Sequence, residues 1–419
     1  MAQLKDDCFA FGDALTPFDD AIADLSGRLD TVVDVERVPI KEAVGRVLAE
    51  YIISDRNVPP HDNSAVDGYA VFFDDLNADE ETRLPVTGRV AAGHPLGRDA
   101  IHGEAVRIFT GAPMPDGMDT VFMEEDTVLQ GDMVALPVGL KHGSNRRFAG
   151  EDVKQGDTIV RAGKRLRPQE VGLAASVGRD TVQVFKKLRV AVFSTGDEVR
   201  DPGGDAPAGC IYDANRYAVM SLLSGMGCAV TDLGILPDNK DAIVSALGSA
   251  KNDHDVLMTS GGVSAGEEDH VKSAVEVLGS IHFWRLAIKP GRPIALGQLD
   301  HASFVGLPGN PVAAMVTFLM IAQPVLRRLG GELAYQPGRF PVVADFDYKK
   351  KPGRREWVRV RIETTDDGHV KALKHHSSGA GILTSMVDAD GLVEMPEDVV
   401  RLEAGEIVTY IPFNGLIAG

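Results

Sequence analysis

The sequence predicts a multidomain chain in which a doubly wound parallel α/β domain is combined with β-rich domains. Strands and helices alternate from about residue 190 to residue 304, a pattern typical of a parallel sheet covered by helices on both faces. Residues 84–160 instead hold short alternating apolar runs separated by turns, and another β-rich segment follows Gly330 and Gly331. At 419 residues the chain is long enough for about two to four domains.

The elements of the predicted α/β domain follow one another in a regular order. An apolar strand at residues 190–193 ends in a polar run, and further strands are expected near 230–236, 256–258 and 302–305. Helices are expected between them at residues 216–226, 240–249 and 268–278. Open α/β sheets bind their ligands outside the carboxyl ends of the strands, so we expect the functional residues there.

Two of these strands end in glycine-rich turns that have the features of binding loops. One continues into residues 259–262 (TSGG) and the other into 306–311 (GLPGNP), where Asn310 can cap a helix and Pro311 can occupy its first turn. Helix N-termini at such turns present free N–H groups to anions. Each loop alone is equally consistent with an ordinary turn, but their proximity favours a site.

Charged residues near these loops predict an anionic ligand and a divalent cation. Lys289 and Arg292 lie on either side of Gly291 in an extended segment that also contains two prolines. Asp269 follows the first loop, and a carboxylate beside a bound phosphate most often holds Mg²⁺. Other acids also fall at or just after strand ends, namely Asp197, Glu198, Asp213 and Asp238. A solvated surface would instead scatter its acids along helices.

Three further segments leave functional and structural interpretations open. The loop VPPHDNSAVDGYAV carries Asp62 and Asp67 and is either a functional loop or a turn that enters a strand. Arg146 and Arg147 suit a phosphate or a polar heterocycle, but exposed arginines are usually solvated surface. Residues 339–361 carry eight cations against three acids, which either serve an anionic ligand or pair with acids of a neighbouring domain.

The pattern of apolar residues predicts two helices near the N-terminus and one long buried helix later in the chain. Thr16 is expected to cap a helix with Pro17 in its first turn, because apolar residues follow at helical spacing. A second helix is expected at residues 40–50. Residues 311–326 form the longest apolar stretch, which is interrupted by polar residues and falls short of the ~20 residues that span a bilayer. We therefore expect a buried helix there.

Composition excludes several classes of function. With 43 Lys and Arg against 61 Asp and Glu, the net charge of −18 argues against nucleic acid and anionic membranes as partners. Three cysteines without a C-x-x-C pair indicate neither a disulfide framework nor a cysteine zinc site, and the acidic N-terminus does not resemble a signal peptide. We expect a cytoplasmic protein. P-loop, G-x-G-x-x-G and H-E-x-x-H motifs are absent, and the pair His375 and His376 is expected at the surface.

Taken in order along the chain, the motifs resemble those of the MoeA family, the molybdopterin molybdenumtransferases, which is related to the C-terminal part of gephyrin. The resemblance covers nearly the whole chain, and its specificity lies in the ordered set rather than in any single motif. The matching segments are NSAVDGYA (63–70), TGAPMP (110–115), GEDVKQG (150–156), STGDEV (194–199), YDANR (212–216), SGGVSAGEED (260–269), KPGRP (289–293), GLPGNP (306–311) and, more weakly, SSGAGILTSM (377–386).

The resemblance implies four domains and a homodimer. These are an elongated helical domain at residues 1–56 and 157–186, an inserted β domain at 57–156, a doubly wound three-layer α/β domain at 187–334 and a C-terminal β barrel at 335–419. The implied cleft lies between the α/β domain of one subunit and the inserted domain of the other. The implied reaction takes adenylylated molybdopterin and molybdate, cleaves the phosphoanhydride with Mg²⁺, inserts molybdenum and releases AMP. A molybdopterin adenylyltransferase and molybdoenzymes are the implied protein partners.

The resemblance also assigns roles to individual residues. Asp67, Thr110 and Asp152 would act from the partner subunit, and Arg285 and Lys289 would supply positive charge. Many relatives carry Lys where this chain has Arg285, and arginine does not give up its proton, so we expect charge stabilisation there rather than proton transfer. Metal ligands would be Asp197, Glu198, Asp238 and Asp269, with Glu198 and Asp269 also catalytic, and substrate would contact Ser260, Gly261, Gly262, Ser264, Asp238, Pro308, Asn310, Pro311, Arg354, Arg355 and Ser378.

Two alternative functions stay open from the sequence. One is the adenylyltransferase step, because that fold shares the SGG and GLPGNP loops, although small adenylyltransferases lack the DGYA and TGA loops. The other is a noncatalytic molybdopterin-binding scaffold, as the relation to gephyrin allows. The intact set of acidic loops and the absence of a long linker favour the transferase.

Overall fold

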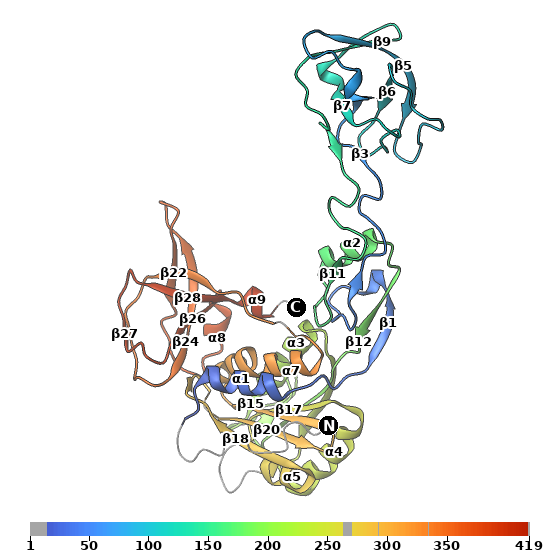
Figure 1. The fold of residues 1–419 in the computed structure, drawn as a ribbon. Helices are drawn as coiled ribbons and strands as arrows, with labels where there is room; N and C mark the ends of the chain where they lie inside the picture. Colours follow the sequence, from blue (N-terminus) through green and yellow to red (C-terminus); the bar gives the residue numbers. More distant parts are fainter. Residues whose placement is uncertain (1–14, 263–269, 292, 334, 418–419) are drawn as a thin grey trace.

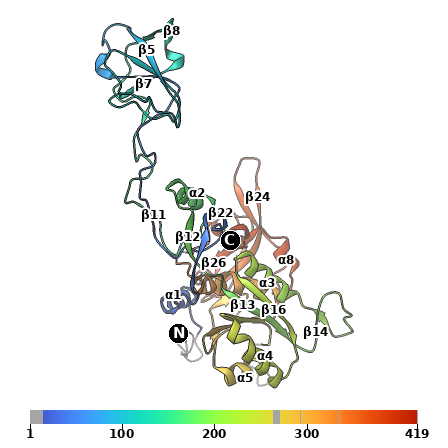
Figure 2. The same ribbon diagram turned by 90° about the vertical axis from the view of Figure 1, so that its right-hand side faces the viewer.

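The structure is a computed structural model, and it describes residues 15–262, 270–291, 293–333 and 335–417, except for the side chains of 283–285, 293 and 417. The α/β domain and the C-terminal barrel lie side by side and form the body of the molecule (Figure 1). An arm, formed by the strands and helix within residues 35–53 and 158–185, rises from this body. It carries the inserted domain at its far end, well away from the barrel (Figures 1 and 2).

A six-stranded sheet forms the centre of the α/β domain, in the order β16-β13-β17-β21-β20-β18. The first four strands are parallel, as expected, whereas β20 runs antiparallel to both of its neighbours. The domain is therefore doubly wound, with an antiparallel strand near one edge. The strands are β13 (Arg189–Thr195), β16 (Ala229–Leu236), β17 (Val256–Ser260), β18 (Ser280–Arg285), β20 (Pro293–Leu299) and β21 (Ala302–Leu307).

Helices cover both faces of this sheet, which gives the three layers that the sequence predicted. Val190 and Val192 of β13 point into a core with α1 (Phe18–Arg28), α3 (Ala214–Gly225) and the helical segment after β21. The alternate residues Ala191 and Phe193 point into a second core with α4 (Lys240–Asp253) and α5 (His270–Leu278). This alternation explains why the strand reads as continuously apolar: both of its faces are buried.

One long apolar helical segment runs through the first of these cores. It consists of α6 (Pro311–Thr317), a π-helical turn (Phe318–Ala322) and α7 (Gln323–Leu329). Its 19 residues are long and apolar enough to cross a membrane, but 83% of the most apolar window is buried inside the protein. The expected buried helix is therefore confirmed, and it is a core helix.

The C-terminal domain is a closed barrel of five strands, because β24 pairs with both β25 and β26 and the ring continues through β22 and β28. A short strand, β19 (Ile288–Lys289), adds to β24 and brings the KPGRP segment of the α/β domain to the barrel. Barrel residues such as Trp357 and Ile411 share a core with the long helix. The barrel strands are β22 (Phe340–Ala344), β24 (Arg355–Thr364), β25 (Val370–Lys374), β26 (Gly391–Met395) and β28 (Ile407–Pro412), accompanied by β23 (Tyr348–Lys349), β27 (Arg401–Leu402), α8 (Thr384–Val387) and α9 (Phe413–Ile417).

The arm is made mainly of strand pairs, and it contains less helix than we expected. β1 (Val35–Pro39) pairs with β12 (Thr181–Phe185), β2 (Ile52–Ile53) pairs with β11 (Thr158–Val160), and α2 (Pro168–Ser176) packs beside them. The inserted domain holds a six-stranded sheet of order β7-β4-β6-β5-β9-β8. Its strands are β4 (Gly68–Val71), β5 (Thr82–Val90), β6 (Ala105–Ile108), β7 (Thr120–Met123), β8 (Val128–Gln130) and β9 (Met133–Leu136), with β3 (Asn63–Ser64) and β10 (Arg146–Arg147) paired below it.

Two local predictions near the N-terminus are wrong. The helix expected at residues 40–50 is only a 3-10 turn (Ile40–Glu42), because Val47 and Leu48 form bridges with residues of the second half of the arm. Thr16 does not cap α1, because it forms a bridge with Leu286 and Pro17 takes the N-cap position. In both cases a long-range backbone pairing prevails over a local helix signal.

Candidate functional site

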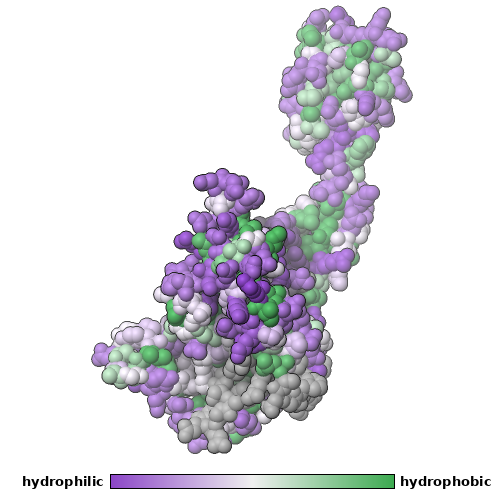
Figure 3. All heavy atoms as spheres, turned by 90° about the vertical axis from the view of Figure 1, so that its left-hand side faces the viewer, coloured by the Kyte–Doolittle hydropathy of each residue, from purple (hydrophilic) through white to green (hydrophobic). Residues whose placement is uncertain are grey.

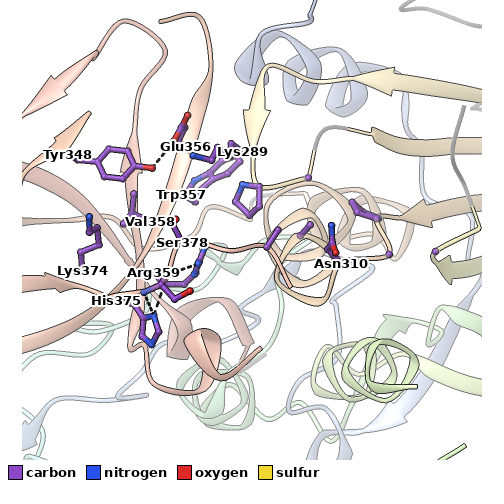
Figure 4. A pocket seen from close by; sticks show the side chains of 18 of the residues that line it. Lys289, Asn310, Tyr348, Glu356, Trp357, Val358, Arg359, Lys374, His375 and Ser378 are labelled. Carbon is purple, nitrogen blue, oxygen red and sulfur yellow. Dashed lines mark hydrogen bonds and ion pairs between the residues drawn. The ribbon is translucent and has the colours of Figure 1, made fainter. Parts of the chain in front are cut away.

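A cavity of about 610 Å³ lies where the carboxyl ends of β17 and β21 meet the barrel; we call it the main cavity (Figure 4). One wall comes from the α/β domain and the other from the barrel, so neither domain forms the cavity alone. The α/β wall consists of Glu198, Gly261, Gly262, Lys289, Pro290, Gly291, Pro308, Gly309, Asn310 and Ala313, and the barrel wall of Tyr348, Glu356, Trp357, Val358, Arg359, Lys374, His375, Ser377, Ser378 and Ala380.

A smaller cavity of about 180 Å³, the side cavity, adjoins the main cavity and shares Glu198, Gly261, Gly262 and Gly309 with it. It continues along the strand ends toward the start of α3, and Asn215 is one of its lining residues. A short strand pair, β14 (Val199–Arg200) with β15 (Ile211–Tyr212), borders it, and its connecting loop projects from the body (Figure 2). The two cavities together extend along the edge of the sheet that sequence reasoning assigned to the ligand.

The glycine loops on the α/β wall are tied together by side-chain hydrogen bonds. The Ser260 hydroxyl donates to the carbonyl of Pro308 at 2.9 Å, and the amide nitrogen of Asn215 donates to Ser260 Oγ at 2.9 Å and to the carbonyl of Gly309 at 2.7 Å. Gly262 adopts a φ of +63°, and a β-carbon there would lie 2.5 Å from Thr195 Oγ1. The loop therefore requires glycine, which leaves its backbone open to a ligand.

Glu356 organises one side of the barrel wall. Only 2% of this residue is exposed, and its carboxylate accepts a hydrogen bond from Tyr348 Oη at 2.7 Å and pairs with Lys289 Nζ at 3.1 Å. Burial, together with the hydrogen bond to this carboxylate, raises the pKa of Tyr348 above its ordinary value. Lys289 therefore reaches the cavity from the α/β domain but is held in place by an acid of the barrel.

Arg359 is the unusual cation of the barrel wall. Only 5% of this residue is exposed, yet all its hydrogen bonds go to neutral groups. Its Nε donates to Ser385 Oγ at 3.1 Å, and its Nη2 donates to the carbonyls of Ser377 at 3.0 Å and Gly379 at 3.3 Å. No carboxylate pairs with it in the part of the chain that the structure describes. Burial lowers its pKa, yet an arginine remains charged in a protein. A buried charge without a counter-ion is costly, so the cavity is suited to an anion at this point.

His375 corrects one expectation from the sequence. It was expected at the surface with His376, but its side chain is only 9% exposed and lines the main cavity. Its Nδ1 accepts a hydrogen bond from the backbone N–H of Ser377 at 3.1 Å, and its ring lies against that of His376. The ring thereby supports the loop whose carbonyls hold Arg359.

Comparison with protein families matches almost the whole chain. Residues 16–178 match the MoeA N-terminal region (domain I and II), 191–328 match the probable molybdopterin binding domain, and 341–413 match the MoeA C-terminal region (domain IV). The chain belongs to the MoeA family. The expectation drawn from the motifs is thus confirmed.

Individual MoeA relatives agree along their full length. A molybdopterin molybdenumtransferase of Haemophilus influenzae is 39% identical over 95% of this chain and 99% of its own, and one of Nostoc is 33% identical over 93% and 92%. The crystal structure of a molybdopterin biosynthesis MoeA protein from Pyrococcus horikoshii superimposes with a TM-score of 0.82 at 29% identity, covering 95% of this chain and 100% of that one.

Many of the MoeA site residues predicted from motifs come together in this fold. Although they lie far apart in the sequence, the sheet edge and the barrel gather them around two adjoining cavities. Glu198, Gly261, Gly262, Lys289, Pro308, Asn310 and Ser378 line the main cavity, and Ser260 and Pro311 line the side cavity.

Other predicted residues lie elsewhere. Asp197 and Asp238 are exposed and line neither cavity; Asp238 follows β16, which is the edge strand of the sheet. Within the described residues, no group of three His, Cys, Asp or Glu could hold a metal ion. Ser264 and Asp269 lie outside the described residues, as does the side chain of Arg285.

Arg354 and Arg355 line neither cavity, contrary to their expected contact with substrate. Arg355 makes two hydrogen bonds of 2.7 Å to Asp19 of α1 and pairs with Glu397 at 3.0 Å, so it fastens the barrel to the first helix. Arg354 lies behind Glu356, at 3.5 Å from its carboxylate. Arg355 therefore pairs with an acid of a neighbouring element. This agrees with the second interpretation of the basic patch at residues 339–361, in which its cations pair with acids of a neighbouring domain.

Asp67 and Thr110 lie together in the inserted domain. Asp67 Oδ1 accepts hydrogen bonds from the backbone N–H and the hydroxyl of Thr110, both at 2.7 Å, and these hold the pKa of the exposed carboxyl below its ordinary range. Asp152 is exposed where the arm joins this domain, beside the bridge between Val58 and Val153. Within one chain, the inserted domain lies far from the main cavity (Figure 1).

Sequence reasoning missed several polar residues of the barrel wall, among them Tyr348, Glu356, Arg359 and Lys374. One signal could have found two of them, because β24 reads REWVRV over its buried half and places Glu356 and Arg359 inside an otherwise apolar strand. Charged residues are almost never buried without a reason. Such a strand is a candidate site even where no glycine-rich loop marks it.

Proposed function

We propose that the protein is a molybdenumtransferase of molybdenum cofactor biosynthesis, which inserts molybdenum from molybdate into adenylylated molybdopterin and releases AMP. Full-length similarity to relatives that carry this name supports the activity. The observation that carries the proposal is the buried Arg359, which faces a two-domain cavity without a carboxylate partner among the described residues. Both proposed substrates are anions, and this cavity is suited to anions.

The geometry suggests how the two substrates share the main cavity. The open backbone of the glycine loops suits the pyrophosphate of adenylylated molybdopterin, and the side cavity leaves room along the strand ends for the rest of the nucleotide. Arg359 and the loop at Ser377 and Ser378 suit a tetrahedral oxyanion such as molybdate. Lys289 lies on the wall between these two regions and can stabilise charge that develops as the phosphoanhydride is cleaved.

A divalent cation fits this arrangement as a ligand of both protein and substrate. Mg²⁺ is usually held by one or two carboxylates together with substrate phosphates, rather than by a cage made only of protein. Glu198 lines both cavities and is the described carboxylate best placed for this role, and Asp269 is the proposed second ligand. When bound, the ion would neutralise charge on the pyrophosphate.

The inserted domain has a role in this proposal only if a second subunit brings it to the cavity. Asp67 and Thr110 form a compact polar loop that has no counterpart from the body of the same chain nearby (Figure 1). Apolar side chains on the arm are exposed, including Tyr51 (60%) and Val44 (54%), and apolar surface gathers on this part of the molecule (Figure 3). A homodimer that covers the arm and closes each main cavity with the partner's inserted domain accounts for both features.

Further partners follow from the chemistry. A molybdopterin adenylyltransferase would supply the adenylylated substrate, and molybdoenzymes would receive the product, all in the cytoplasm. The strongly acidic chain is not proposed to bind nucleic acid or membranes. The adenylyltransferase alternative is less well supported because half of the main cavity, including Arg359, comes from the barrel. A noncatalytic scaffold that binds the anionic molybdopterin would also be served by Arg359, and only AMP release distinguishes the transferase from it.

A reaction with purified components tests the proposal. The protein is incubated with adenylylated molybdopterin, Mg²⁺ and molybdate, and AMP is measured. We expect release that depends on molybdate and on Mg²⁺, and we expect Asp269→Ala to abolish it. AMP at background levels would contradict the transferase, and formation of adenylylated molybdopterin from ATP and molybdopterin would support the adenylyltransferase instead.

A further inference from the structure

A second large cavity lies at the junction between the arm and the α/β domain; we call it the junction cavity. It measures about 360 Å³ and shares no lining residue with the main or side cavity. The turn around Gly45 and the side chain of Arg165 line it from the arm. The segment from Phe185 to Leu188, the loop around Cys228 and the end of α7 line it from the other side. The proposed reaction makes no use of it.

The lining of the junction cavity is strongly cationic. Glu42 is the only carboxylate among its lining residues, all of which lie in the described part of the chain. Because the chain as a whole carries a net charge of −18, this is a local reversal of sign. Five cations line the cavity: Arg46, Arg165, Lys186, Lys187 and Arg327.

The buried Arg327 and the half-buried Arg165 share a single carboxylate. Glu332 pairs with Arg165 Nη2 at 2.9 Å and with Arg327 Nη1 at 2.8 Å, and the side chains of Arg327 and Glu332 are only 4% and 9% exposed. Arg327 Nε is buried and has no hydrogen-bond partner within the described residues. One guanidinium charge is therefore left without a counter-ion, which is unfavourable in a low-dielectric environment.

Neighbouring groups do not supply the missing negative charge. Burial raises the pKa of the Cys228 thiol to about 11, even though Arg165 and Arg327 act in the opposite direction, so the thiol is neutral at physiological pH. Tyr335 packs its ring against the Arg327 guanidinium at 3.9 Å, and burial raises its pKa as well. Among the described residues, Glu332 is therefore the one carboxylate that pairs with these two arginines.

The remaining cations differ in how far they are already paired. Arg46 pairs with Glu36 and donates to the carbonyl of Phe185, and Lys186 pairs with Asp34 at 3.1 Å. Lys187 is exposed at the rim and has no hydrogen bond or ion pair with any residue that the structure describes. Within the described residues, the lining thus combines one exposed cation without an ion pair, Lys187, with the buried Arg327, whose Nε has no partner.

We propose that the junction cavity binds a phosphate group, either free phosphate or a small phosphate monoester, between Lys187 and Arg327. Arginine suits phosphate because its planar guanidinium can donate two parallel hydrogen bonds. A bound phosphate would link the arm, through Arg46 and Arg165, to the α/β domain, through Lys187 and Arg327. It would therefore fix the arm that carries the inserted domain, and it would raise the melting temperature of the protein by binding only the folded state.

The test is isothermal titration calorimetry of the full chain with inorganic phosphate, and separately with glycerol phosphate, at low ionic strength. The variants are Lys187→Glu, the matched control Lys141→Glu on the inserted domain, and Arg359→Ala, which removes the cation of the main cavity. Lys141 and Lys187 are both exposed, so neither change disturbs a buried contact.

Because the main cavity also suits an oxyanion, the variants are compared in the Arg359→Ala background. There we expect Lys141→Glu to leave the affinity for phosphate unchanged and Lys187→Glu to weaken it at least tenfold. The tighter of the two probes identifies whether free phosphate or a monoester is the better ligand, and either result supports the site. Equal affinity of the Arg359→Ala protein with and without Lys187→Glu would overturn the proposal. Loss of all binding in Arg359→Ala would also overturn it, because the phosphate would then occupy the main cavity.

Discussion

The charged groups of the inserted domain and the buried arginine of the main cavity differ in how they are compensated. In the inserted domain, carboxylates are satisfied by neighbours: Asp67 by Thr110, and the buried Glu104 by two hydrogen bonds from Arg98 at 2.8 and 2.9 Å. In the main cavity, the buried Arg359 has only neutral partners among the described residues. The first arrangement stabilises a fold, and the second leaves part of the electrostatic stabilisation to a ligand.

Whether a buried charge has an oppositely charged partner distinguishes structural charges from functional ones better than residue type does. Arg355 and Arg359 lie on the same strand and are both buried, yet Arg355 has carboxylate partners in Asp19 and Glu397. By this criterion Arg355 is a structural charge, and Arg359 is the candidate for a functional one. Four experiments test this distinction between structural and functional charges.

The largest effect is expected for Arg359→Ala. Removing a buried donor that faces an oxyanion typically lowers a rate by about 10² to 10³, and we expect a loss of this size in kcat/KM for molybdate-dependent AMP release. Arg359→Lys should recover part of it, because the charge is kept without the paired donors. Arg361→Ala, an exposed change two residues further along the strand, is the control and should be nearly neutral. Equal rates for the two alanine variants would contradict a functional role of Arg359.

Glu104→Gln should instead affect the stability of the inserted domain. The Arg98 guanidinium, with Thr87 and the N–H of Ile101, lowers the pKa of Glu104 to about 2 from an ordinary 4.5. A lowered folded-state pKa stabilises the fold above pH 4.5, and this contribution is lost as the pH falls from 4.5 toward 2. The contribution is about 3 kcal/mol at neutral pH.

Hydrogen exchange of peptides from the inserted domain measures this effect, because both tryptophans of the chain lie outside that domain. Wild type should be better protected than Glu104→Gln at pH 7, and the difference should shrink at pH 3. Activity per folded molecule should change little. A difference that does not depend on pH would show that the ion pair is not its cause.

Asp67→Ala tests whether the inserted domain completes the cavity of a partner subunit. Loss of a hydrogen-bonding carboxylate that contacts substrate costs roughly 1.5–3 kcal/mol, so we expect about a ten- to hundredfold loss of activity. Mixed dimers of Asp67→Ala and Arg359→Ala chains are the sharper experiment. Each mixed dimer retains one intact composite site, and activity should return to about half of wild type. Mixed dimers as inactive as their parents would place both residues in the site of one chain.

Tyr348→Phe should have the smallest effect. It removes one hydrogen bond to Glu356 while Lys289 and Arg354 still contact that carboxylate, so we expect a loss of about 1 kcal/mol, or roughly fivefold, in activity. Steady-state kinetics on the variant measures it. A hundredfold loss would show that Tyr348 contacts the substrate directly rather than positioning Lys289 through Glu356.

The α/β half of the site could be predicted from sequence because its features are local. A strand that ends in TSGG or GLPGNP has a specific conformation, and parallel strands necessarily bring those ends together, as they do at Gly261 and Pro308. The β-rich character of the last segment was also predictable from its apolar runs, whereas the barrel was implied by the motif resemblance. The motif resemblance then supplied the order of the domains.

The barrel half of the site could not be predicted in the same way. Arg354, Arg355 and Arg359 look alike within a basic patch, and what distinguishes them is the position of Asp19, which lies more than three hundred residues away in sequence. Barrel closure and the docking of α1 decide which arginine is paired. Similarly, the failed helix at residues 40–50 reflects strand partners in the distant second half of the arm.

Anomalous X-ray diffraction at the molybdenum edge, from crystals soaked in molybdate, tests the central claim most directly. We expect a molybdenum peak in the main cavity in contact with the guanidinium of Arg359, and no such peak in crystals of Arg359→Ala. Molybdenum bound only outside the main cavity, or bound there equally well without Arg359, would contradict it.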